Sequence, residues 1–314
     1  MPKKTLTSLL LASLLLFITG QAQPELEGTI TVSGAFALYP MMVKWSEEFR
    51  AIHPKVNIDI SAGGAGKGMA DVLAGLVDIA MVSREIRPEE TQKGAFGIAV
   101  VKDAVFPTVN ENNPVLNDLL ARGATKATFI GIWIEGRIKT WGQVVSRTDV
   151  TAPINVYTRS DSSGAAEVWA KFLGERAQED LLGTGVFGDP GIADAVARDS
   201  LGIGYNNLGF AFDPDSKRPV RGLVVLPIDV NENGQVDPEE GPYTTRDQAM
   251  EAVSGGTYPS PPARELNLVT LGKPTGLAQL FLIWILADGQ QFVSEAGFIP
   301  LSQERLQEEL GKLQ

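Results

Sequence analysis

Three times the sequence passes from a short strand-like run, through a glycine-containing loop, into a helix with one apolar face. The first of these helices opens with Pro40, a residue suited to a first helical turn, and places Met42, Trp45 and Phe49 at steps of three and four residues. The third loop also carries an arginine, Arg159. The strand and loop segments are residues 29–32 with 33–36, 56–60 with 61–68, and 154–158 with 159–164.

Loops of this kind are suited to holding an anion. Glycine lets the backbone approach a ligand closely, and the unpaired N–H groups at a helix start, together with the helix dipole, attract negative charge. One such loop usually only connects two elements, whereas three in one chain indicate a binding function. The loop from Gly63 to Gly68 lacks the Gly-Lys-Ser/Thr ending of a nucleotide phosphate loop and does not read as a dinucleotide fingerprint, so we set nucleotide binding aside.

The first 22 residues have the pattern of an export signal. Lys3 and Lys4 form a basic start, residues 9–18 an apolar run, and Gly20-Gln21-Ala22 a small-x-small cleavage site. The sequence contains no cysteine, which excludes disulfides, thiolate chemistry and a lipid-attachment cysteine. We therefore expect a mature chain that starts near Gln23 and is soluble in the periplasm or outside the cell.

The chain is acidic, with a formal net charge of −11, and the signal segment would remove two of its lysines. Such a balance argues against nucleic acid as a partner. It does not exclude an anionic ligand, because helix N-termini and a few arginines set the local field whatever the net charge is. We expect the protein to be a monomer.

Six stretches of the sequence match a known family in order: 33–40 with Lys44-Trp45, 63–68, 77–84, 159–164, 201–205 and 281–298. Through them the chain resembles the phosphate-specific branch of the periplasmic binding proteins of ABC importers. The resemblance implies an α/β, two-lobed periplasmic-binding-protein fold of type II, in which the chain crosses the hinge twice. Residues 23–106 plus 263–314 would form lobe I, and residues 107–262 would form lobe II. The anion would close the lobes, and the loaded protein would dock on an ABC transporter membrane permease.

The resemblance also implies where phosphate or a related oxyanion would be held. Arg159 keeps the family's guanidinium for bidentate pairing, Ser163 keeps its hydroxyl donor, and Gly164 keeps its close-approach glycine. Eight positions follow as expected ligand contacts: Phe36, Ala37, Ala65, Ser83, Arg159, Ser163, Gly164 and Ala165.

The chain departs from the family at four of these positions. The family's hydroxyls fall on Phe36, Ala65 and Ala165, which leaves only backbone N–H groups as donors there. The family's carboxylate, which accepts a proton from phosphate and so rejects fully ionised sulfate, falls on Ser83. Phosphate, another oxyanion such as sulfate or tungstate, and a homologue with an altered or lost ligand all remain open at this point.

Residues 229–240 match the twelve-residue calcium loop, with oxygen-bearing side chains at positions 1, 3, 5, 9 and 12 and glycine at position 6. A strand-like run precedes the loop and Gly241-Pro242 follows it, so the flanks are not those of a helix-loop-helix hand. The sequence predicts a structural Ca²⁺ in an insertion of lobe II, and a polar turn without metal is the alternative. The expected ligands are Asp229, Asn231, Asn233, Gln235 through its carbonyl, Asp237 and Glu240.

The sequence does not predict an enzyme. His53 is the one histidine of the chain, and it stands at a helix end rather than in a cluster of catalytic or zinc-binding residues. Ser163 lies in no Gly-x-Ser-x-Gly motif and has no evident histidine partner. A secreted phosphatase and a scaffold protein without ligand are the alternatives to a binding protein.

Overall fold

The computed structural model describes residues 25–314, and the predicted signal segment at 1–22 lies outside them. Within the described range, no helix has the length and apolar character needed to cross a membrane. Nine β-strands are formed: β1 (Glu27–Gly34), β2 (Lys55–Ala62), β3 (Ile79–Val82), β4 (Ala95–Asn110), β5 (Asn155–Arg159), β6 (Thr184–Val186), β7 (Gly202–Asn207), β8 (Leu223–Val225) and β9 (Ala263–Leu271).

The same range contains twelve α-helices and three short 3₁₀ helices. The α-helices are α1 (Tyr39–Ile52), α2 (Ala65–Leu73), α3 (Pro88–Gln92), α4 (Leu116–Arg122), α5 (Lys126–Trp133), α6 (Trp141–Val144), α7 (Gly164–Phe172), α8 (Gly188–Arg198), α9 (Leu208–Ala211), α10 (Arg246–Gly255), α11 (Gly276–Leu286) and α12 (Gln303–Leu313). The 3₁₀ helices are η1 (Phe36–Leu38), η2 (Gln178–Asp180) and η3 (Asp288–Phe292). The three predicted strand-loop-helix junctions are confirmed as β1 to α1, β2 to α2 and β5 to α7.

One long strand, β4, is shared by the two halves of a curled sheet, whose strand order is β2-β1-β3-β9-β4-β7-β5-β6, with β8 also beside β4. β1 pairs in parallel with β2 and β3, while β9 runs antiparallel to both β3 and β4. β4 pairs with β9 along residues 95–104 and with β7 along residues 105–109. The strand therefore leaves one half of the sheet and enters the other without a break.

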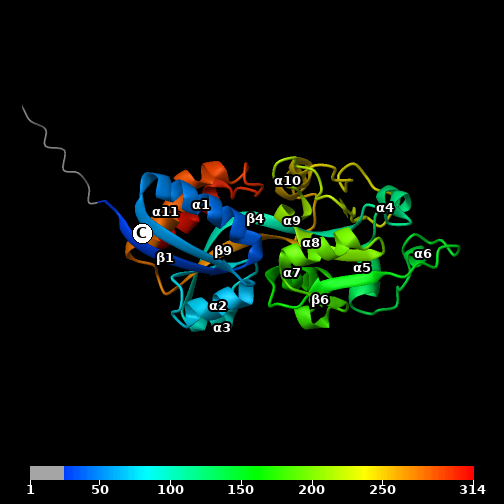
Figure 1. The fold of residues 1–314 in the computed structure, drawn as a ribbon, viewed down its shortest axis with the longest axis horizontal. Helices are drawn as coiled ribbons and strands as arrows, with labels where there is room; N and C mark the ends of the chain where they lie inside the picture. The colour runs from blue at the N-terminus through cyan, green and yellow to red at the C-terminus, as the bar shows by residue number, and fades with distance from the viewer. Residues whose placement is uncertain (1–24) are drawn as a thin grey trace, which may run out of the picture.

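Two hydrophobic cores lie at the two ends of β4. One is built from residues between 30 and 101 and between 266 and 313, and we call its surroundings the first lobe. The other is built from residues between 104 and 263, together with Ile299, and we call its surroundings the second lobe. Figure 1 shows the two lobes side by side, with β4 and β9 running between them. The predicted two-lobed α/β fold is thus confirmed.

Candidate functional site

The three strand-loop-helix junctions face one another where the lobes meet. Gly66 of the second junction donates its N–H to the carbonyl of Ser162 in the third, with a nitrogen to oxygen distance of 3.1 Å. A Cβ added to Gly64 would lie 2.6 Å from that same carbonyl oxygen, and one added to Gly164 would overlap Ser83. Glycine is required at these positions because backbone from one lobe lies directly on the other.

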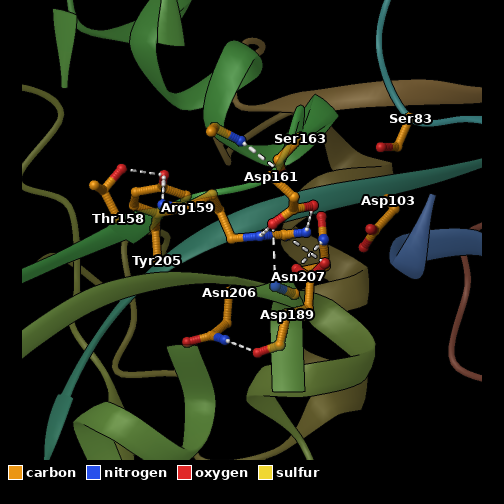
Figure 2. Close-up of polar contacts among 12 residues, drawn as sticks. Ser83, Asp103, Thr158, Arg159, Asp161, Ser163, Asp189, Tyr205, Asn206 and Asn207 are labelled. Atoms are coloured by element: carbon orange, nitrogen blue, oxygen red, sulfur yellow. Dashed lines mark hydrogen bonds and ion pairs between the residues drawn. The ribbon is translucent and has the colours of Figure 1, made fainter. Parts of the chain in front are cut away.

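Arg159, the last residue of β5, occupies the centre of this interface, and its side chain is only 2% exposed. Its Nε and Nη2 donate to the two oxygens of Asp161 at 2.8 and 2.6 Å, and its Nη1 donates to Asp189 at 2.6 Å. Figure 2 shows the guanidinium reaching between these two carboxylates. Burial acts to lower the pKa of Arg159, but the neighbouring Asp189 and Asp161 outweigh it and raise that pKa above its ordinary value.

The backbone that carries Arg159 is fixed by a buried tyrosine of β7. The Tyr205 hydroxyl lies 2.8 Å from Thr158 Oγ1 and accepts the N–H of Arg159 at 3.3 Å. The Tyr205 ring stacks on Trp169 of α7, with 5.8 Å between the ring centroids. Burial raises the pKa of Tyr205, so its hydroxyl keeps its proton over the whole neutral range. Through these contacts Tyr205 holds β5 and α7 in fixed positions beside Arg159.

Phe36 of the first lobe covers Arg159 of the second. The guanidinium carbon lies 5.5 Å from the centroid of the Phe36 ring, within the range of a cation–π contact. The same ring meets Phe187 edge to face at 5.7 Å, and a Cβ on Gly188 would lie 3.1 Å from it. Phe36 is the first predicted ligand position, and its side chain forms a contact between the lobes.

The other predicted positions lie at the starts of the same helices. Ala37, Ala65 and Ala165 are buried, respectively in η1 and in the first turns of α2 and α7. The hydroxyl of Ser163 caps α7 by accepting the N–H of Ala166 at 3.3 Å. The structure therefore brings these loops to one interface, and their contacts with an anion stay a prediction.

A chain of buried polar groups leads from Arg159 to β4 and β9, the two strands that run between the lobes. The sequence patterns did not indicate this chain. Asp189 accepts a hydrogen bond from the Asn207 amide, whose oxygen accepts one from Arg264 of β9. Arg264 also pairs with Asp103 of β4 at 3.2 Å and donates to the Ser83 carbonyl at 3.2 Å. Burial raises the pKa of Asp103 and lowers the pKa of Arg264.

One sequence signal could have pointed to Asp189. It stands in the first turn of α8, after β6 and a Gly188 with φ of +76°, so the Val186 to Pro190 segment is a fourth junction of strand, glycine and helix. β6 has only three residues and lacks a strong strand pattern. The residues around Arg264 and Asn207 carry no comparable local signal.

A cluster of ion pairs joins the lobes beside this site, and we call it the interlobe ion-pair cluster. Its members are Arg84, Glu85 and Arg87 of the first lobe and Glu167 and Lys171 of α7. Glu167 lies 2.7 Å from Arg87 and 3.2 Å from Arg84, and Lys171 lies 3.0 Å from Glu85. The α7 helix that carries Ser163 and Gly164 is thereby tied to the opposite lobe.

The predicted calcium ligands lie in one irregular loop whose oxygens are turned toward backbone N–H groups. Asp229 accepts from Asn233 and Gly234 at 3.1 and 2.9 Å, and Glu240 accepts from Val230 at 2.7 Å. The Asn231 and Asn233 amides both donate to Asp237, and Gln235 is exposed. Between residues 25 and 314, no set of three or more acidic, histidine or cysteine side chains is arranged to hold a metal ion. Calcium binding therefore stays a prediction.

One family model matches most of the chain. It is described as a PBP superfamily domain and covers residues 19–288. The chain is 28% identical to Protein SphX of Synechococcus elongatus over 282 residues, which are 87% of this chain and 77% of that protein. It is 26% identical to Phosphate-binding protein PstS of Bacillus subtilis over 296 residues, covering 92% of this chain and 86% of the relative.

Solved structures share the fold at lower identity. A protein from Clostridium perfringens, described as a phosphate ABC transporter substrate-binding protein with bound phosphate, superposes with a TM-score of 0.70 at 22% identity, over 88% of this chain and 100% of its own. An ABC-type phosphate transport receptor from Vibrio cholerae gives a TM-score of 0.62 at 20% identity, over 87% of this chain and 100% of its own. These structures have the same two-lobed architecture.

Proposed function

The chain belongs to the PBP superfamily, and on that basis we propose that it is an extracytoplasmic solute-binding protein that captures phosphate between its lobes and delivers it to an ABC permease. The signal at residues 1–22 would direct its export, and it would act as a monomer without catalytic activity. The moving units would be residues 23–106 with 263–314 and residues 107–262. Relatives named for phosphate binding match nearly the whole chain, which supports this assignment.

The observation that carries the proposal is the hydrogen bonding of Arg159. A guanidinium has five N–H groups, and the two carboxylates beside Arg159 accept three of them. Arg159 precedes the loop that leads to the N-terminus of α7, where backbone N–H groups and the helix dipole also favour negative charge. An oxyanion with several acceptor oxygens fits such a convergent set of donors.

Phe36 supports a mechanism of lobe closure. Its ring belongs to the first lobe and lies on the cation and on Phe187 of the second, so this contact forms only when the lobes are together. An anion that binds Arg159 and the first-lobe loops at the same time favours that closed arrangement. The permease would recognise the closed form.

The test is a calorimetric titration of the mature, phosphate-stripped protein with phosphate and then with sulfate, at fixed salt concentration. We expect tight binding of phosphate and much weaker binding of sulfate. Binding heat with sulfate but not with phosphate would identify a different oxyanion as the ligand. Binding heat with neither anion would favour a scaffold protein without ligand.

We also propose that residues 229–240 bind a structural Ca²⁺. The spacing of the oxygen ligands, the inward-facing Asp229 and Glu240, and the φ of +77° at Gly234 support this assignment. Calcium should raise the melting temperature of the wild type and leave that of Glu240→Gln unchanged, because position 12 supplies the bidentate ligand. Equal melting temperatures of the wild type in calcium and in a chelator would exclude the site.

A further inference from the structure

Arg159 is paired with two buried carboxylates, although one would neutralise it. Asp161 forms a fork with Nε and Nη2, and Asp189 takes Nη1 alone. Both acids are almost fully buried, with side chains 5% and 3% exposed. The second carboxylate leaves the immediate surroundings of the arginine with an excess negative charge at the place where an anion is to bind.

The wider buried network does not remove this excess. Arg264 and Asp103 at the hinge balance each other, and Asn207, which links them to Asp189, is neutral. With all groups ionised, the network holds two positive and three negative charges. A buried charge without a partner costs free energy, so the excess negative charge affects which anions the site binds.

The two carboxylates differ in how many hydrogen bonds they already accept. One oxygen of Asp161 accepts both Arg159 Nε and the N–H of Gly188, and the other accepts Nη2 and lies against Gly64. Asp189 accepts one hydrogen bond on each oxygen, from Arg159 and from Asn207. An ionised carboxylate has about four acceptor positions, so Asp189 retains capacity for a further donor.

We propose that Asp189 determines which oxyanion this site selects. It shares the Nη1 end of Arg159 with the incoming anion, so it repels a fully ionised dianion and accepts a hydrogen bond from an oxyanion that carries a proton. Asp161 has a different role, because its fork fixes the direction of the guanidinium. This inference rests on the proposed function, and it assigns the selectivity for protonated oxyanions to a residue of the second lobe.

The experiment compares Asp189→Asn with the wild type by calorimetric titration with phosphate and with sulfate at pH 7 and fixed salt. The substitution keeps the shape of the side chain and removes the excess charge. The ratio of phosphate affinity to sulfate affinity should fall by at least about tenfold, chiefly because sulfate binds more tightly. Asp194→Asn is the matched control, because Asp194 lies on the same helix in an exposed pair with Arg198 and should leave the ratio unchanged.

The outcomes separate this inference from the proposed function. A wild type that binds neither anion overturns both. A wild type that binds phosphate, together with an Asp189→Asn variant of native melting temperature and unchanged affinity ratio, overturns the inference alone. Equal loss of both anions in that variant also overturns it, because Asp189 would then only position Arg159. If Asp189→Asn does not fold, the same comparison is made with Asp189→Ser, for which the same fall in the ratio is expected.

Discussion

Replacing Arg159 with alanine removes the guanidinium at the lobe interface and leaves Asp161 and Asp189 buried without their cation. Phosphate affinity should fall by about 2–5 kcal/mol, because a charged hydrogen-bonding partner is lost from a buried site. The free energy of unfolding should fall by about 3–5 kcal/mol as well, because breaking a buried ion pair leaves uncompensated charge. Calorimetric titration and denaturant unfolding measure the two effects separately.

The control for this change is Arg137→Ala, since Arg137 is an exposed residue paired with Glu135. It should leave both quantities close to those of the wild type. Equal phosphate affinity of wild type and Arg159→Ala would remove Arg159 from the binding site.

The contrast between Arg159 and Asp189 shows what sequence reasoning reaches at the residue scale. Arg159 ends β5, directly before the loop that leads into α7, and both elements were visible from local apolar patterns. Asp189 touches it from 30 positions further along the chain. Their contact depends on β5 and β6 pairing in parallel, and no local pattern specifies that pairing. Networks of buried polar groups are therefore the part of the site that the sequence leaves undetermined.

At the scale of single elements, the short helix α3 makes stability depend on pH. Its third residue, Glu90, accepts two hydrogen bonds from Arg84 and one from the N–H of Arg87. Burial acts to raise the pKa of Glu90, but these hydrogen bonds outweigh it and hold that pKa below its ordinary value of 4.5. A carboxyl with a lowered pKa stabilises the fold above its ordinary pKa and loses that contribution as the pH falls through the folded-state value.

Glu90→Gln should therefore cost about 1.5–3 kcal/mol of unfolding free energy at pH 7, because hydrogen bonds to a charged group are lost. The difference from the wild type should shrink as the pH falls below 4.5 and through the lower pKa that Glu90 has in the folded protein. Thermal unfolding between pH 7 and pH 3 measures this. The exposed neighbour substitution Glu89→Gln should show no such trend, and a pH-independent deficit of Glu90→Gln would contradict the assignment.

Helix α7 carries two members of the interlobe ion-pair cluster, Glu167 and Lys171. Glu167→Gln removes the partner that Arg84 and Arg87 have in the second lobe, while Arg84 keeps Glu90. The closed arrangement should lose about 0.5–1 kcal/mol, which is a two- to five-fold weaker affinity for phosphate. The affinity should also become less sensitive to salt.

Titrations at low and high salt measure both consequences, with Glu179→Gln as the control because Glu179 is exposed in η2. An affinity of Glu167→Gln equal to that of the wild type at low salt would show that the pairs do not favour closure. These pairs were not predicted from the sequence, because their members lie on two different lobes and meet only after folding.

For the whole molecule, the contact of Phe36 with Arg159 and Phe187 predicts a change of shape on binding. We expect that, without an anion to bridge them, the lobes separate about β4 and β9 in spite of the interlobe ion-pair cluster. Phosphate should reduce the radius of gyration of the wild type measured by small-angle X-ray scattering, and should leave that of Arg159→Ala unchanged. A wild type with the same radius in both conditions would contradict hinge closure.

The position of β9 in the sheet sets the order in which the molecule can assemble. β9 lies between β3 and β4, yet it follows the whole second lobe in the chain. During synthesis, nearly every segment of the second lobe emerges before β9, the central strand of the first-lobe sheet. Until β9 has been synthesised, one edge of β3 stays unpaired. The lobe that carries the arginine can therefore mature early, whereas the lobe that carries the glycine loops at Gly34 and Gly64 is completed only when the C-terminal segment returns.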